Sequence, residues 1–145
     1  MRIADCQICF SHGQESGPWG TKILAMAELA RDRGVAVESL DYRGMPDPTE
    51  RVRKLVAWGG GIEAPLILVG SSMGGHVAAA ASAELEVAAL FLIAPAFYMP
   101  GYEALTPTAR AGRITIVHGW HDEIVPAAHS VRWAEEHGAE LHLLN

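Results

Sequence analysis

The sequence predicts an α/β protein in which a mostly parallel sheet of about six strands lies between two helix layers, a three-layer α/β/α architecture. Two observations support this prediction. Short apolar runs bounded by turn residues alternate along the chain with segments that have helical spacing. The apolar runs are continuous rather than alternating, which is typical of parallel strands that helices cover on both faces.

The predicted strands are apolar runs that are bounded by turn residues. In chain order they are Cys6–Phe10, Val35–Leu40, Leu66–Val69, Ala88–Ile93, Ile114–Val117 and Leu141–Leu144. Four helices are predicted between them from apolar spacing and from the proline or glycine at some of their ends. These helices are Thr21–Arg33, Pro48–Trp58, Met73–Ser82 and Ala127–His137.

The composition indicates a single domain over residues 1–145. Half of the 145 residues are hydrophobic and 19% are charged, which suits one buried core. The net charge of −6 comes without a basic stripe, so nucleic acid is not an expected partner. No apolar stretch reaches the roughly 18 residues of a membrane helix, and the amino terminus lacks signal-peptide order. A cytoplasmic protein with no membrane partner is therefore expected.

Cys6 and Cys9 have the C-x-x-C spacing of some redox and zinc sites. Both lie in an apolar run predicted as a strand, where residues three apart point to opposite faces. We therefore expect two buried structural thiols.

A candidate nucleophile follows the third predicted strand. The segment Gly70-Ser-Ser-Met-Gly74 has the pattern G-x-S-x-G between a buried strand and an alanine-rich helix. A tight strand-to-helix turn of this kind pushes the Ser72 hydroxyl out of the sheet, and glycines at 70 and 74 avoid collisions there. The Met73 amide, at the helix start, can face a developing oxyanion. A glycine-rich connecting turn is the alternative.

Two further segments follow other predicted strands. His12-Gly13-Gln14 comes after the first strand, and His118 to Pro126 comes after the fifth. In the latter, Asp122 lies at the strand edge where parallel sheets bind ligands. A turn or capping role is the alternative for Asp122, and Glu123 is the rival acid.

With the turn Asp41-Tyr-Arg-Gly44, these segments resemble the α/β-hydrolase superfamily, in particular its small lidless bacterial esterases and thioesterases. The resemblance implies a minimal α/β-hydrolase fold with Ser72 as nucleophile and Asp122 as the acid that orients a histidine. It also implies that the backbone amide of Gln14 is a second oxyanion donor beside that of Met73. No cofactor is implied.

The catalytic histidine of this family follows the final strand, and Leu141–Leu144 is the last strand predicted. We therefore expect the loop that carries it, and the last helix, to lie outside residues 1–145. Among the histidines present, His142 lies within the strand and His121 adjoins Asp122. The others are expected to be structural or solvated: His12 and His118 in loops, His76 beneath the site, His129 and His137 on the last helix.

The leading hypothesis is a serine hydrolase that cleaves a small ester or thioester. Aromatic and methionine side chains in Ala94–Gly112 are expected to line an open apolar pocket. The alternative hypothesis is a non-catalytic hydrolase-like binding or interaction protein without the triad histidine. A metal site at His118, His121 and Asp122 is disfavoured because no distant third ligand is evident.

Overall fold

The computed structural model describes residues 1–145, in which six strands form one fully parallel sheet. The strands are β1 (Gln7–Ser11), β2 (Ala36–Leu40), β3 (Leu66–Ser71), β4 (Val87–Ile93), β5 (Arg113–Gly119) and β6 (Glu140–Leu144). The helices are α1 (Thr21–Asp32), α2 (Pro48–Gly59), α3 (Met73–Ser82) and α4 (Ala127–His137), with short 3₁₀ turns at Ile3–Asp5 and Glu103–Leu105. The predicted fold class and every predicted strand and helix are confirmed.

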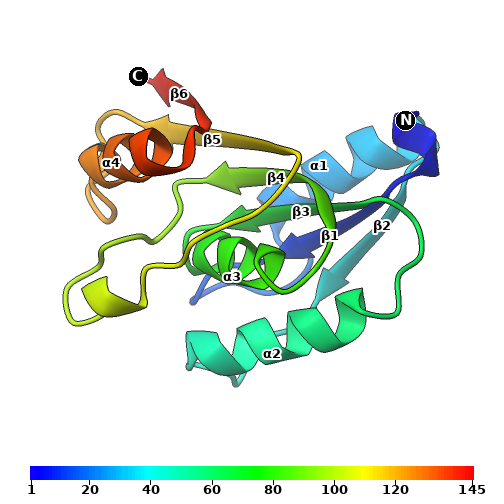
Figure 1. Ribbon diagram of the computed structural model, residues 1–145, viewed down its shortest axis with the longest axis horizontal. Coiled ribbons are helices and arrows are strands. Elements are labelled where there is room, and N and C mark those ends of the chain that lie inside the picture. Colours follow the sequence, from blue (N-terminus) through cyan, green and yellow to red (C-terminus); the bar gives the residue numbers. More distant parts are fainter.

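Helices cover both faces of the sheet, as Figure 1 shows. On one face, α2, α3 and α4 share a core with the strands, and this core includes Leu55, Val77 and Trp133. On the other face, α1 packs Ile23 and Ala27 against β1 and β3 in a smaller apolar cluster. The sheet is therefore the middle of three layers.

The order of the strands brings three loops to one edge of the sheet. The spatial order is β2-β1-β3-β4-β5-β6, so the chain moves outward from β1 to β2 and then returns to place β3 on the other side of β1. The direction of strand order thus reverses between β1 and β3, and the loops after these two strands diverge there. Sheets of this type bind ligands at such a topological switch point. Because β5 is parallel to both strands, the loop after it opens on the same edge.

Local signals explain where the helices begin and end. Asp47 precedes Pro48 and caps α2, since its carboxylate accepts a hydrogen bond of 2.9 Å from the Thr49 amide. Gly138 closes α4 with a φ of 63°, a left-handed conformation that suits glycine. None of the helices is long and apolar enough to cross a membrane.

Candidate active site

Ser72 lies in the turn between β3 and α3, at the carboxyl edge of the sheet. Its φ of 54° and ψ of −118° place it in a region that side-chain-bearing residues rarely occupy. The end of β4 and the segment after it hold this conformation, because the Ser72 amide donates to the Ile93 carbonyl at 3.0 Å and the Ser72 carbonyl accepts from the Ala96 amide at 2.9 Å. Such imposed strain is typical of functional positions.

The glycines of the motif are required by close backbone contacts. A Cβ at Gly70 would overlap the carbonyl oxygen of Gly74, and a Cβ at Gly74 would overlap the carbonyl oxygen of Ser11. At Gly75 a Cβ would come within 2.8 Å of the Pro95 side chain. The start of α3 therefore sits directly on the ends of β1 and β4, which a larger residue would prevent.

Two clefts open beside Ser72. One has a volume of about 260 Å³ and is lined by Gln14, Pro46, Pro48, Ser72, Met73, His76, Ala96, Met99, Pro100, Tyr102, Ile124 and Val125. The segment after β4 thus contributes apolar side chains to this wall, as the sequence predicted. The other cleft, of about 440 Å³, lies toward the start of α1 and is lined mostly by glycines and polar residues, with Lys22 among them.

Met73 and Gln14 both line the apolar cleft beside Ser72. Met73 is the first residue of α3, where backbone N–H groups have no partner within the helix. Neither amide donates a hydrogen bond within the protein. A Cβ built on Gly13, which precedes Gln14, would lie 3.7 Å from the Cβ of Ser72. The loop after β1 therefore adjoins the serine, and both amides are free to bind an anion.

Asp122 lies in the loop between β5 and α4. Its Oδ1 accepts hydrogen bonds of 2.8 Å and 2.9 Å from the amides of Ile124 and Val125, and its Oδ2 lies 3.3 Å from Nε2 of His118. Burial by itself raises the pKa of this carboxyl, but the Val125 and Ile124 amides and His118 outweigh it and lower the pKa below its ordinary value. A rigidly held carboxylate results. Glu123, its predicted rival, is exposed.

His118 holds this loop in place. Its Nδ1 is 2.7 Å from the Ser130 hydroxyl on α4, and its Nε2 is 2.8 Å from the Val125 carbonyl. The imidazole is fully buried and both ring nitrogens have partners. This is the structural role that the sequence predicted for it.

No histidine of residues 1–145 joins Ser72 to Asp122. His142 lies in β6, 2.6 Å from Glu140, and His121 is exposed with no hydrogen bond from its side chain. His76 lines the apolar cleft one turn after Ser72, and burial lowers the pKa of its imidazole.

The histidines of α4 correct one expectation, since they are half-buried rather than solvated. His129 Nδ1 is 2.7 Å from the Phe97 carbonyl, and His137 stacks on Trp133 with ring centroids 3.8 Å apart. Phe97 lies outside α4, so helical spacing does not reveal its contact with His129, whereas Trp133 precedes His137 by one turn of the same helix.

The cysteines are buried and unpaired, as expected. Burial raises the pKa of the Cys9 thiol to about 12, so this thiol stays protonated at neutral pH. No group of three or more His, Cys, Asp or Glu side chains is arranged to hold a metal ion.

One buried residue near the site, Arg51, was not predicted from the sequence. Arg51 of α2 is only 2% exposed, and its guanidinium donates to the carbonyls of Met45, His12 and Gly13. The available signal was its position one turn before Leu55, on the apolar stripe of a helix that otherwise buries no charge.

Comparisons with known proteins extend over nearly the whole chain. Residues 10–143 match the sequence profile of the Alpha/beta hydrolase family. A protein from Xanthomonas campestris pv. campestris, assigned to the hydrolases of the alpha/beta superfamily, is 33% identical. Its structure superposes with a TM-score of 0.85 over 96% of this chain and 86% of that one.

Two other solved structures share the fold at lower identity. The ydeN gene product of B. subtilis is 16% identical, with a TM-score of 0.82 over 96% of this chain and 84% of that one. A lidless a/b serine hydrolase from Xanthomonas campestris is 23% identical, with a TM-score of 0.72 over 97% of this chain and 71% of that one. No curated protein matches the sequence.

Proposed function

The chain belongs to the alpha/beta hydrolase family, and from this premise we propose that it is a serine hydrolase that cleaves small esters or thioesters through an acyl-enzyme on Ser72. The observation that carries the proposal is the conformation of Ser72. A serine held at positive φ between a strand and a helix, beside two unused backbone amides, has the arrangement that acyl transfer requires.

In the proposed reaction, the Ser72 hydroxyl oxygen attacks the substrate carbonyl while a histidine accepts the hydroxyl proton. The amides of Met73 and Gln14 donate to the oxyanion of the tetrahedral intermediate. The same histidine then protonates the leaving alcohol or thiol, which departs and leaves an acyl-enzyme. Water hydrolyses the acyl-enzyme in a second round of the same steps.

Asp122 is proposed to orient that histidine and to stabilise its charged form. Its lowered pKa keeps the carboxyl ionised at neutral pH. Two backbone amides fix its Oδ1, so the carboxylate has one defined orientation in the loop after β5. These properties suit the acid of a Ser-His-Asp triad.

We propose that the base is a histidine in a segment that follows β6, as the family resemblance implies. The register of the sheet supports this position. Gly119, at the end of β5, pairs with Leu144, at the end of β6, and the Trp120 amide donates to the Leu144 carbonyl at 2.6 Å. A segment that continues from β6 would therefore emerge beside the loop that carries Asp122.

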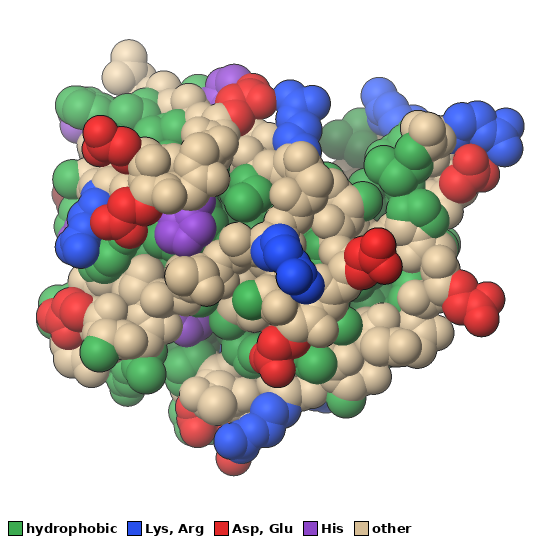
Figure 2. All heavy atoms as spheres, viewed as in Figure 1, with side chains coloured by type: hydrophobic (Ala, Val, Ile, Leu, Met, Phe, Trp, Pro, Cys, Tyr) green, Lys and Arg blue, Asp and Glu red, His purple; other side chains and the backbone are tan.

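The cleft beside Ser72 supports small acyl groups as substrates. Its volume of about 260 Å³ suits a short or medium chain, and its walls include Met99, Tyr102 and Ile124. Figure 2 shows acidic and basic side chains interspersed on one face, without a large patch of either sign. No Asp, Glu, Lys or Arg side chain lines the cleft, so an uncharged small molecule is the proposed substrate. A cytoplasmic location remains part of the proposal.

Hydrolysis of p-nitrophenyl esters of increasing chain length tests this proposal. The full-length protein should turn over the shorter esters, and Ser72→Ala should reduce the rate to background. A form ending at Asn145 should be impaired by up to about 10⁶-fold, because the serine then lacks its base. If the full-length protein is no faster than Ser72→Ala on any ester, the non-catalytic binding protein becomes the better account.

A further inference from the structure

Arg51 is a buried cation without an acidic partner. Its Nε donates to the Met45 carbonyl at 2.7 Å, and its guanidinium carbon lies 5.3 Å from the centre of the Tyr42 ring. No ion pair of the structure includes it. A fully buried charge is normally paired, so its retention among carbonyl groups calls for a specific role.

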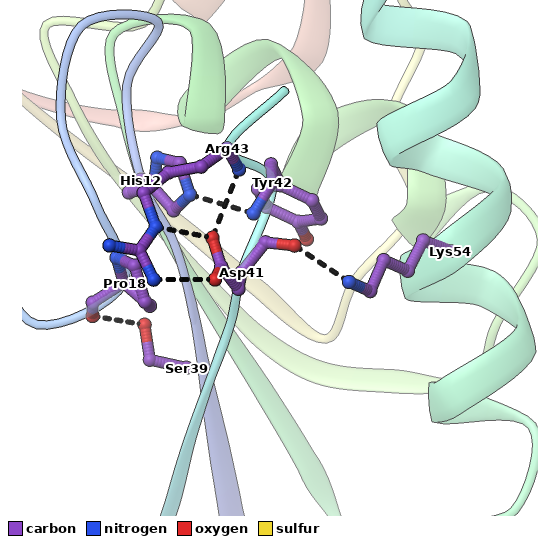
Figure 3. A network of polar contacts seen from close by, with 7 residues as sticks. All are labelled: His12, Pro18, Ser39, Asp41, Tyr42, Arg43 and Lys54. Carbon is purple, nitrogen blue, oxygen red and sulfur yellow. Dashed lines mark hydrogen bonds and ion pairs between the residues drawn. The ribbon is translucent and has the colours of Figure 1, made fainter. Parts of the chain in front are cut away.

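The Nη1 of Arg51 reaches the loop after β1, where it lies 3.1 Å from the His12 carbonyl and 3.3 Å from the Gly13 carbonyl. The Gly13 carbonyl has a second buried partner in His12. The Tyr42 amide donates to Nε2 of His12 at 2.8 Å, as Figure 3 shows, so the proton of this imidazole resides on Nδ1. That Nδ1 then donates to the Gly13 carbonyl at 2.8 Å.

The Gly13 carbonyl, which accepts hydrogen bonds from Arg51 and His12, belongs to the same peptide unit as the Gln14 amide. All peptide bonds of the chain are trans, so this C=O and this N–H point in opposite directions. The carbonyl faces Arg51 of α2, and it also accepts from His12 and, at 3.4 Å, from the Ser16 hydroxyl. The Gln14 amide therefore points away from Arg51, and Gln14 lines both clefts beside Ser72. A cationic donor on the carbonyl also polarises the peptide and makes its N–H a stronger donor.

We propose that Arg51 is a positioning residue of the oxyanion site, acting through the Gly13 carbonyl on the Gln14 amide. It sets the direction of that amide and strengthens the hydrogen bond to the oxyanion that forms at Ser72. This inference rests on the proposed serine hydrolase function, since it needs an oxyanion to bind. A purely structural anchor between α2 and the loop after β1 is the competing explanation.

Steady-state kinetics on a short p-nitrophenyl ester separate these explanations in the full-length protein. Arg51→Met, which removes the charge and keeps the length, should lower kcat about 10²-fold and leave KM within about threefold. Arg53→Met, an exposed position on the same helix, should match the wild type. A folded Arg51→Met variant with kcat within about threefold of wild type would overturn the inference.

Arg51→Lys covers the case in which Arg51→Met fails to unfold cooperatively. Lysine keeps the charge, but a single ammonium group cannot replace a planar guanidinium that donates to the Met45 carbonyl and to the carbonyls of the loop after β1 at the same time. We expect kcat to fall about tenfold with KM unchanged. An unchanged kcat in this variant would count against the inference.

Inhibitor binding provides a second test. A purely structural role for Arg51 predicts no difference between an inhibitor that forms an oxyanion and one that does not. A trifluoromethyl ketone forms a hemiketal when the Ser72 hydroxyl adds to its carbonyl and the proton passes to the base, which leaves an oxyanion. The matching alcohol binds without one. In the Arg51 variants the Ki of the ketone should rise in parallel with the loss of kcat, while the Ki of the alcohol stays constant. Equal changes for both would establish the structural role.

Wild-type turnover no faster than Ser72→Ala would refute the proposed function, and this inference with it.

Discussion

The carboxylate of Asp122 lies 3.3 Å from the buried imidazole of His118, four residues earlier in the chain. His118 also contacts the Val125 carbonyl and the Ser130 hydroxyl, so one ring on β5 holds both the end of the loop and α4. The loop that presents the proposed triad acid is therefore built around a histidine that is not itself available as a base.

His118→Ala should destabilise the protein by about 2–4 kcal/mol, because Ser130 and Val125 would lose buried hydrogen-bond partners and a cavity would remain. Urea unfolding measures this change. His121→Ala, at an exposed position of the same loop, should change the free energy of unfolding by less than about 0.5 kcal/mol. Similar losses in the two variants would mean that His118 does not anchor the loop.

Asp122→Asn should fold and lose on the order of 10⁴ in turnover, since an amide favours the wrong tautomer of the catalytic histidine. The measurement is kcat of the full-length protein on a short ester. Glu123→Gln should change kcat little, because the Glu123 side chain is exposed. Comparable losses at the two positions would show that the acid is misassigned.

The lowered pKa of Asp122 predicts a specific dependence of stability on pH. A carboxyl with a depressed folded-state pKa stabilises the protein above its unfolded pKa of about 3.9, and this contribution is lost as the pH falls through the folded value. The difference in Tm between wild type and Asp122→Asn should therefore be full at neutral pH and shrink below about pH 4. Thermal unfolding from neutral to acidic pH measures it, and a constant difference would contradict the assignment.

Gly74→Ala tests the packing beneath the nucleophile turn. The added Cβ would overlap the Ser11 carbonyl, so unfolding should become easier by about 3 kcal/mol or more and esterase activity should be lost. Gly119→Ala is the matched control, because a Cβ there meets no atom within 4 Å. Equal stability of the two variants in urea would show that the turn tolerates a side chain.

The fold was predictable because its strands are uninterrupted apolar runs that end at turn residues. The place of Ser72 in a tight strand-to-helix turn was also predictable, because Gly70 and Gly74, which the close backbone contacts there require, are visible in the sequence. The role of Arg51 was not predictable, because it depends on where α2 crosses the loop after β1, and these segments are separated by an intervening helix and strand. The half-buried state of His129 likewise depends on the path of the segment after β4.

Labelling with a fluorophosphonate tests the central claim, that Ser72 is an activated nucleophile, most directly. The full-length protein should incorporate one label, and mapping of the modified peptide should place it on Ser72. Ser72→Ala should abolish labelling while the thermal unfolding transition persists. Ser71→Ala should label normally, since Ser71 ends β3 and its hydroxyl instead faces Lys22 at 3.4 Å. Labelling that survives in Ser72→Ala, or that is lost in Ser71→Ala alone, would contradict the account.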